Sequence, residues 1–216
     1  MYLEQLNRES GQYGLMFGPD PSSAKIATIG GVVGNNATGA HSILYGMAGD
    51  NVEACKLFLN KGESAHLSAN RNKSPIYEKL YSLRKKYSDK IKNDFPKHWR
   101  RASGYSLNYL LDKPFNPAKL LAGAEGTLGL ATEFTLNLVD RPKHTGLAIL
   151  EFDSMIQAME GVPVILERNP SAIELIDKYL IDLTRANSSY SRMLTFIEGD
   201  PKAILVIEFY GDTESE

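Results

Sequence analysis

Closely spaced glycines mark two stretches of this chain, residues 18–49 and residues 122–129. The first stretch holds Gly30, Gly31, Gly34, Gly39, Gly46 and Gly49. Such spacing interrupts regular elements and permits positive φ, so we expect both stretches to be loops. Backbone N–H groups in glycine-rich loops approach anions closely, which favours a nest for phosphate oxygens.

Small polar side chains add hydrogen-bond donors to the first loop. They are Thr28, Asn35, Asn36, Thr38 and Ser42. In the second loop, Glu125-Gly126-Thr127-Leu128-Gly129, the carboxylate of Glu125 is suited to accept from a ribose hydroxyl or an amide. Glycine content alone leaves two alternatives open, namely a ligand-binding pair of loops or tight turns that join strands.

Hydrophobic periodicity and capping residues predict the regular elements around these loops. We expect helices over residues 3–13, 75–95, 107–111, 154–168 and 178–186. We expect strands over residues 51–59, 132–139, 147–152 and 203–211, with a further apolar stretch at 172–177. A boundary between two parts of the chain is predicted near residues 140–144, where Arg-Pro-Lys-His interrupts the pattern.

The segment 71–101 is strongly basic, with eleven Lys and Arg against three acidic residues, a net charge of +8. Apolar residues recur there at helical spacing, at Ile76, Leu80, Leu83, Tyr87 and Ile91. This stripe predicts an amphipathic helix with its lysines on the solvated face. Lysine-rich helix faces are usually plain surface, so we do not expect nucleic-acid binding. A docking surface for an acidic partner fits better.

Composition excludes several classes of protein. The chain has 216 residues, a net charge of −2 and one cysteine, Cys55. A disulfide framework and a cysteine-rich zinc module are therefore excluded, and we expect Cys55 to be a small buried apolar residue. The four histidines are scattered, so no metal site is predicted. No apolar run approaches the roughly 18 residues of a membrane span, and no signal peptide is apparent, so we expect a cytoplasmic protein.

Three ordered motifs resemble a known family. They are PDPSSAKIATIGGVVGNNATG at 19–39, RRASGYSLNYLL at 100–111 and AGAEGTLGLATEFTLNLVDRP at 122–142. Together they resemble the flavin-binding domain of the vanillyl-alcohol oxidase and p-cresol methylhydroxylase flavoproteins. Within that superfamily the chain is most similar to FAD-linked oxidases of the D-lactate dehydrogenase, glycolate oxidase and D-2-hydroxyglutarate dehydrogenase group, above all the large members with an iron–sulfur region.

The resemblance implies an α+β fold in two parts. Residues 1–143 are expected to be a partial FAD-binding domain of the p-cresol methylhydroxylase type, a mixed or antiparallel sheet with flanking helices. Residues 144–216 are expected to begin a ferredoxin-like, substrate-binding cap. Full family members carry a further flavin-binding subdomain and a longer cap, so we expect this chain to be a fragment without catalytic residues.

The resemblance also implies the flavin contacts. Along the FAD it places Pro19, Asp20, Ser22, Thr28, Gly30, Gly31, Asn35, Asn36, Thr38 and Gly39. Toward the adenosine it places Glu125, Gly126 and Leu130. Arg100 and Arg101 match a basic position before the Ser-Gly-Tyr motif of the family, which leaves two alternatives open: they face the flavin or substrate, or they have a plain surface role.

Two functional hypotheses follow. The first is a fragment of an FAD-dependent oxidoreductase that oxidises a D-2-hydroxy acid by hydride transfer to flavin. It is inactive alone, binds FAD weakly or not at all, and in its full-length form lies in the cytoplasm or at the inner membrane. The second is a non-catalytic scaffold or partner subunit that associates through its basic helix or its sheet edges. The partners considered are a second copy, the missing domains or an iron–sulfur region.

Overall fold

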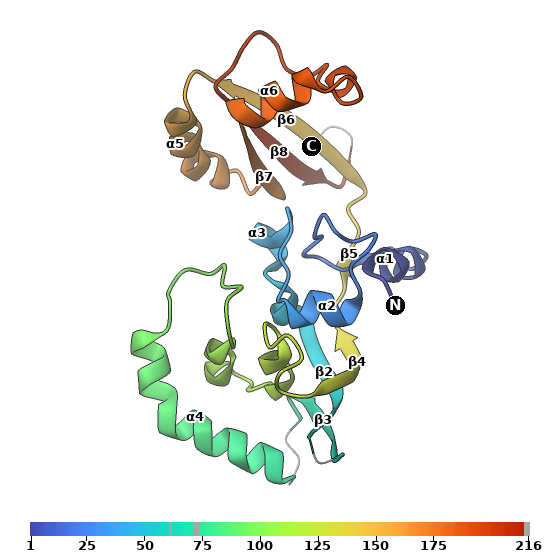
Figure 1. Cartoon of the computed structure of the whole chain (residues 1–216), viewed down its shortest axis with the longest axis vertical. Helices are drawn as coiled ribbons and strands as arrows, with labels where there is room; N and C mark the ends of the chain where they lie inside the picture. Colours follow the sequence, from blue (N-terminus) through green and yellow to red (C-terminus); the bar gives the residue numbers. More distant parts are fainter. Residues whose placement is uncertain (61, 71–73, 214–216) are drawn as a thin grey trace. The chain divides into compact units, whose positions relative to one another are not determined.

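The chain divides into two compact units, Met1–Arg141 and Pro142–Glu216, in a computed structural model that describes residues 1–60, 62–70 and 74–213 (Figure 1). Each unit has its own sheet and its own apolar core. Arg71 and Lys73, two members of the basic segment, lie outside the described residues.

A three-stranded antiparallel sheet, in the order β3-β2-β4, forms the centre of the first unit. Its strands are β2 (Val52–Phe58), β3 (Ser64–Ser68) and β4 (Leu130–Leu136). The central strand β2 buries Val52, Cys55 and Leu57 in the largest core cluster. Cys55 is 2% exposed, which confirms its prediction as a small buried apolar residue.

The register of β2 against β4 shifts between Val52 and Ala54. The buried Asn116 side chain donates from Nδ2 to the carbonyl oxygens of Val52, at 3.0 Å, and Glu53, at 2.9 Å. Asn116 also caps the 3-10 helix η3 (Pro117–Leu121) by accepting from the N–H of Ala118. One side chain thus satisfies the strand irregularity and fixes η3 beside it.

The basic segment forms α4 (Pro75–Asp94), which confirms the predicted helix. Pro75 occupies the first turn, and the Tyr77 hydroxyl is 2.8 Å from both the N–H and the carbonyl oxygen of Ser68 in β3. The predicted apolar stripe is only partly buried. Ile91 belongs to the core, whereas Leu83 and Tyr87 are 37% and 39% exposed.

Short helices interrupt the loop predicted at residues 18–49. They are α2 (Ile29–Gly34), α3 (Ser42–Tyr45) and the 3-10 helix η1 (Ala48–Asn51). The loop prediction was wrong for these residues because Thr28 caps α2 and the buried Val32 and Val33 anchor it. Glycine content alone does not reveal those stabilising contacts.

Four further elements complete the first unit. The helix α1 (Leu3–Gly11) and the 3-10 helix η2 (Leu107–Leu111) lie where helices were predicted. A two-stranded sheet, which was not predicted, pairs β1 (Leu15–Met16) with β5 (Val139–Asp140). Strands β1 and β5 have two residues each, which is too short to produce a recognisable alternation.

The second unit runs β6 (His144–Phe152), α5 (Met155–Leu166), β7 (Ala172–Asp177), α6 (Lys178–Ala186), the 3-10 helix η4 (Ser191–Met193) and β8 (Ala203–Gly211). Its sheet order is β6-β8-β7, with β8 antiparallel to both neighbours. Strands β6 and β7 are therefore parallel and separated by β8, a split β-α-β unit as in ferredoxin-like folds. Ala158 of α5 and Leu205 of β8 belong to one core cluster. The predicted α+β class with antiparallel sheets is confirmed.

Candidate ligand-binding groove

Two glycine-rich segments far apart in the sequence meet through backbone hydrogen bonds. The N–H of Glu125 donates to the carbonyl oxygen of Gly34 at 3.0 Å. The N–H of Gly123 donates to the carbonyl oxygen of Val33 at 3.2 Å. The loop that precedes β4 is thereby fixed against the C-terminal end of α2.

The two segments line a common hollow of about 390 Å³. Its lining residues are Gly30, Gly31, Gly34, Asn35, Glu125 and Gly126. Gly30, Gly34 and Gly126 also line a neighbouring hollow of about 260 Å³ that reaches Leu130 at the start of β4. Five of the predicted flavin contacts thus lie around one space, and Leu130 adjoins it. Gly34, which was not predicted, belongs there too.

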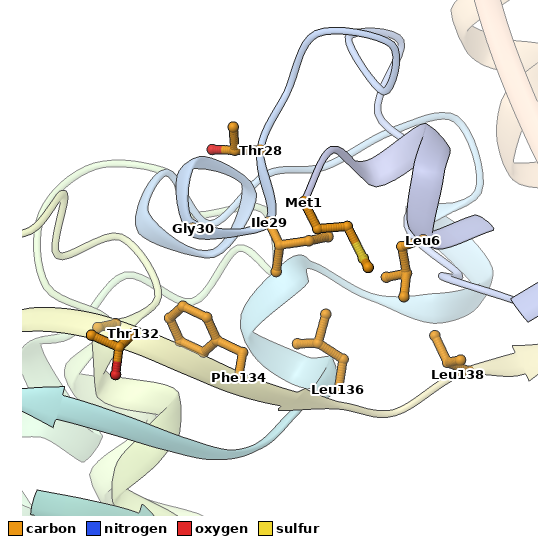
Figure 2. A pocket seen from close by; sticks show the side chains of 10 residues that line it. Met1, Leu6, Thr28, Ile29, Gly30, Thr132, Phe134, Leu136 and Leu138 are labelled. Atoms are coloured by element: carbon orange, nitrogen blue, oxygen red, sulfur yellow. The ribbon is translucent and has the colours of Figure 1, made fainter. Parts of the chain in front are cut away.

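Apolar side chains extend this space along β4. A third hollow has a volume of about 340 Å³. In Figure 2, Phe134 and Leu136 of β4 and Leu138 beyond it lie opposite Ile29 and Met1 across this hollow. Gly30 lines this hollow as well, so Gly30 is common to all three. We call the three hollows together the α2–β4 groove. The alternation of Thr132, Phe134 and Leu136 in the sequence was the signal for this apolar face.

Gly30 is a glycine that the fold itself does not explain. It is exposed, its φ is not positive, and no atom outside its own stretch of helix lies within 4 Å of the place where a Cβ would stand. A glycine inside a helix costs about 1 kcal/mol relative to alanine. Its N–H has no acceptor among the described residues, because the Thr28 side chain accepts from Gly31 instead.

Gly126 offers a second free N–H group to the same groove. Glu125 and Gly126 have φ of +48° and +78°, and space around the Cβ position of Gly126 is open. No acceptor for the Gly126 N–H is found within the described part of the chain. Exposed N–H groups beside glycines, in a groove with an apolar extension, fit a ligand that carries both phosphate oxygens and a flat ring.

Other predicted contacts lie in a separate cluster, where Gly39 packs on the backbone of Pro19 and Asp20. A Cβ at Gly39 would stand 1.9 Å from the Asp20 carbonyl oxygen. The Asp20 carboxylate lies 3.1 Å from Nδ1 of His41. Pro19 is fully buried, while Ser22 is exposed. Gly39 is therefore required by packing, whether or not a ligand lies near it.

The Asn36 side chain is occupied by protein partners. It is 2% exposed, and its Oδ1 accepts from the N–H of Gly49 at 2.8 Å. Its Nδ2 donates to the Arg101 carbonyl oxygen at 3.4 Å and lies 3.5 Å from the Ser106 hydroxyl. The amide thus joins the first glycine-rich segment to the loop that follows α4. Only the backbone of Asn36 remains for a ligand.

The two arginines predicted near a ligand have different surroundings. Arg100 donates from Nη2 and Nε to the Thr38 hydroxyl, at 2.7 and 3.1 Å, so it is held on the first glycine-rich segment. Arg101 donates to the carbonyl oxygen of His98 at 2.6 Å, and its guanidinium stacks 5.6 Å from the Phe95 ring centre. The guanidinium of Arg100 is exposed.

Comparison with known families identifies two matching regions. Residues 1–68 match the FAD binding domain, and residues 141–216 match the C-terminal domain of FAD linked oxidases. D-2-hydroxyglutarate dehydrogenases of Pseudomonas putida and Escherichia coli are each 28% identical to this chain, covering 99% and 98% of it. A D-lactate dehydrogenase of Anaerostipes hadrus is also 28% identical over 99% of the chain.

The chain spans 23% of the length of each of those two D-2-hydroxyglutarate dehydrogenases and 38% of the D-lactate dehydrogenase. Among solved structures, an alkyldihydroxyacetonephosphate synthase matches 98% of this chain with a TM-score of 0.63 and 17% identity. The match covers 33% of that synthase, and it supports the fold alone. Among the described residues, no helix is both long and apolar enough to cross a bilayer.

Proposed function

Because the chain belongs to the FAD-linked oxidases, we propose that its α2–β4 groove holds part of an FAD in an enzyme that oxidises a D-2-hydroxy acid. The observation that carries this proposal is Gly30, an exposed helical glycine with a free N–H at the point where three hollows meet. Neither packing nor a positive φ requires glycine there. Close approach of a ligand to the backbone accounts for it.

In this proposal the backbone N–H groups of Gly30 and Gly126 donate to cofactor oxygens. Glu125 and Leu130 then lie toward the adenosine side, as the family resemblance implies. Asn35, Gly31 and Thr28 continue the same exposed surface. FAD supplies the two-electron acceptor, and the protein orients it and excludes water around it. The groove's apolar wall of Phe134 and Leu136 provides that exclusion on one side.

The substrate class follows from what the relatives have in common. Their names specify D-2-hydroxyglutarate, D-lactate and glycolate, all of which are 2-hydroxy acids. Arg100, held by Thr38 at the edge of the glycine-rich segment, is the residue that we propose for the substrate carboxylate. We also propose that residues 1–143 form a partial flavin domain and that 144–216 begin the cap.

Amide NMR of the isolated chain tests the flavin part of the proposal. FAD added to the ¹⁵N-labelled chain should shift the signals of Gly30, Gly31 and Gly126 in a saturable way. The glycines of the second unit, Gly146 and Gly161, serve as internal controls and should stay fixed. We expect weak affinity, because the chain spans only 23% of the D-2-hydroxyglutarate dehydrogenases and 38% of the D-lactate dehydrogenase. If FAD shifts none of the signals of Gly30, Gly31 and Gly126, the flavin site is contradicted. If the chain is purified with stoichiometric flavin, the expectation of weak affinity is contradicted.

The alternative, a non-catalytic scaffold, makes a different prediction. It requires a dimer or complex that forms without flavin, through the basic helix or through the sheet edges β6 and β7. Light scattering with and without FAD separates the two. A monomer that gains thermal stability with FAD supports the flavin site.

A further inference from the structure

A second groove in the first unit lies between the C-terminal half of α4 and the 3-10 helix η2. Its volume is about 470 Å³. Lys90 and Asp94 are the two charged residues in its lining, and the others are apolar or aromatic. The full lining is Leu83, Tyr87, Lys90, Ile91, Asp94, Phe95, Pro96, Leu107 and Leu110. We call it the α4–η2 groove. None of its residues lines the α2–β4 groove.

The groove has a buried apolar base and an exposed apolar rim. Ile91 and Leu110 at its base are 7% and 5% exposed and belong to the main core cluster. Leu83, Tyr87 and Leu107 at its rim are 37%, 39% and 39% exposed. Concave apolar surfaces of this size with few polar groups are typical of binding sites.

A row of lysines runs along the groove on the same helix. Lys79, Lys86 and Lys90 are spaced so that they share one flank of α4, next to Leu83 and Tyr87. The Lys86 ammonium lies 5.1 Å from the Tyr87 ring centre. None of the three lysines has an ion pair within the residues that the structure describes.

The segment around the groove carries far more basic than acidic side chains. Residues 74–101 carry nine basic and three acidic side chains, or +6, in a chain of net charge −2. Asp94, in the groove, is the one acidic side chain among its lining residues. Among the described residues the lysines therefore lack a full set of acidic partners, and their complement is an acidic surface.

We propose that the α4–η2 groove binds an acidic amphipathic helix of a partner protein. The partner's apolar side chains, at helical spacing, would fill the space between Leu83, Tyr87 and Leu107. Its carboxylates would face Lys86 and Lys90. Two features favour a helix over a bilayer or a nucleic acid: the surface is concave, and its buried base, formed by Ile91 and Leu110, is apolar.

A designed peptide tests this surface on the full chain. The probe is a fluorescein-labelled helical peptide with leucines at i, i+4 and i+7 flanked by glutamates, and its binding is followed by fluorescence anisotropy. We expect saturable binding that weakens about tenfold between about 50 mM and about 300 mM salt. A scrambled peptide of the same composition should bind at least about tenfold more weakly, because its leucines no longer share a face.

Matched variants locate the binding surface. The double variant Lys86→Glu, Lys90→Glu should lose about tenfold or more in affinity. Its control, Lys85→Glu, Lys92→Glu, changes the charge of the same helix equally but on the opposite flank, and should lose less than about threefold. Leu107→Asn should weaken binding, whereas Ile26→Asn, an exposed site outside the groove, should not. Circular dichroism confirms that each variant keeps the fold.

Three results would overturn the proposal. The first is equal binding of the designed and scrambled peptides, or no binding of either. The second is sedimentation with phosphatidylglycerol vesicles that Lys86→Glu, Lys90→Glu abolishes while the peptide fails to bind, which assigns the surface to a membrane. The third is a dimer in light scattering that the same double variant dissociates, which assigns the groove to a second copy of the chain.

Discussion

The backbone N–H of Glu125 donates to the carbonyl oxygen of Gly34 over 3.0 Å, and this bond joins the two glycine-rich segments. Gly34 ends α2, and Glu125, with a φ of +48°, begins the turn that leads into β4. The protein's own hydrogen bonds therefore set the spacing of the groove walls. A ligand that enters this groove meets a surface whose backbone is already ordered, which lowers the cost of binding.

Gly30→Ala separates ligand binding from folding. A methyl group at this position meets no atom from outside its own stretch of helix within 4 Å, and alanine favours the helix, so stability should stay equal or rise by about 0.5–1 kcal/mol. The same methyl group projects into the groove and should weaken FAD binding about tenfold. Urea unfolding and an FAD titration measure the two effects. A variant that binds FAD like the native chain would remove Gly30 from the site.

Gly39→Ala is the contrasting change. Its Cβ would stand 1.9 Å from the Asp20 carbonyl oxygen and 2.3 Å from that of Pro19, both of which belong to backbone. Relief requires movement of the chain, so we expect a loss of more than about 2 kcal/mol in unfolding free energy. Urea unfolding without FAD is the measurement. Unchanged stability would show that the close approach at Gly39 is easily relaxed.

Asn36→Ala should destabilise the first unit by about 2–3 kcal/mol, because it leaves the buried N–H of Gly49 without its acceptor. It also removes the side chain that reaches Ser106 and the Arg101 carbonyl oxygen. Asn35→Ala is the matched control, since that neighbouring side chain is exposed, and it should change stability by less than about 0.5 kcal/mol. Equal unfolding midpoints for the two variants would contradict the role assigned to Asn36.

Local pattern was sufficient for the elements with strong periodicity. The predicted helix at 178–186 is α6, because its apolar residues have helical spacing after the cap Asp177. The predicted strand at 203–211 is β8, because it is a run rich in β-branched and aromatic residues. Prediction from the local pattern was wrong at α2, because each glycine in a helix costs about 1 kcal/mol relative to alanine and so favours a loop. Burial of Val32 and Val33 and the cap from Thr28 outweigh that preference, and burial depends on contacts that no local window contains.

The groove was predictable in its residues but not in its geometry. Gly30 and Gly126, both predicted as flavin contacts, line one hollow, and their convergence depends on bonds from Glu125 to Gly34 and from Gly123 to Val33. The sequence also does not distinguish the two roles that were open to the Asn36 side chain. An asparagine between glycines suits a ligand and suits a buried bridge equally well, and only the positions of Gly49 and Ser106 distinguish the two.

Cys55 should be inert in the native chain. Burial raises the pKa of its thiol to about 12, so almost no thiolate is present near neutral pH. We expect its reaction with Ellman's reagent at about pH 8 to run at least about a thousandfold slower than in denaturant, where one thiol should titrate fully. Immediate stoichiometric reaction of the folded chain would show that β2 is open to solvent.

Asp200 should make the second unit sensitive to acid. Hydrogen bonds from Lys178 and Lys202 lower the pKa of its carboxyl from 3.8 to about 2. A lowered folded-state pKa means that the stabilisation is fully present above the unfolded value and is lost as pH falls through the folded one. Asp200→Asn should therefore lower the urea midpoint at about pH 5, and the difference from the native chain should disappear between about pH 4 and about pH 2. Asp153→Asn, a residue without an ion pair in the described part of the second unit, should leave the midpoint nearly unchanged. If the Asp200→Asn difference instead persisted below about pH 2, the ion pairs with Lys178 and Lys202 would not be its source.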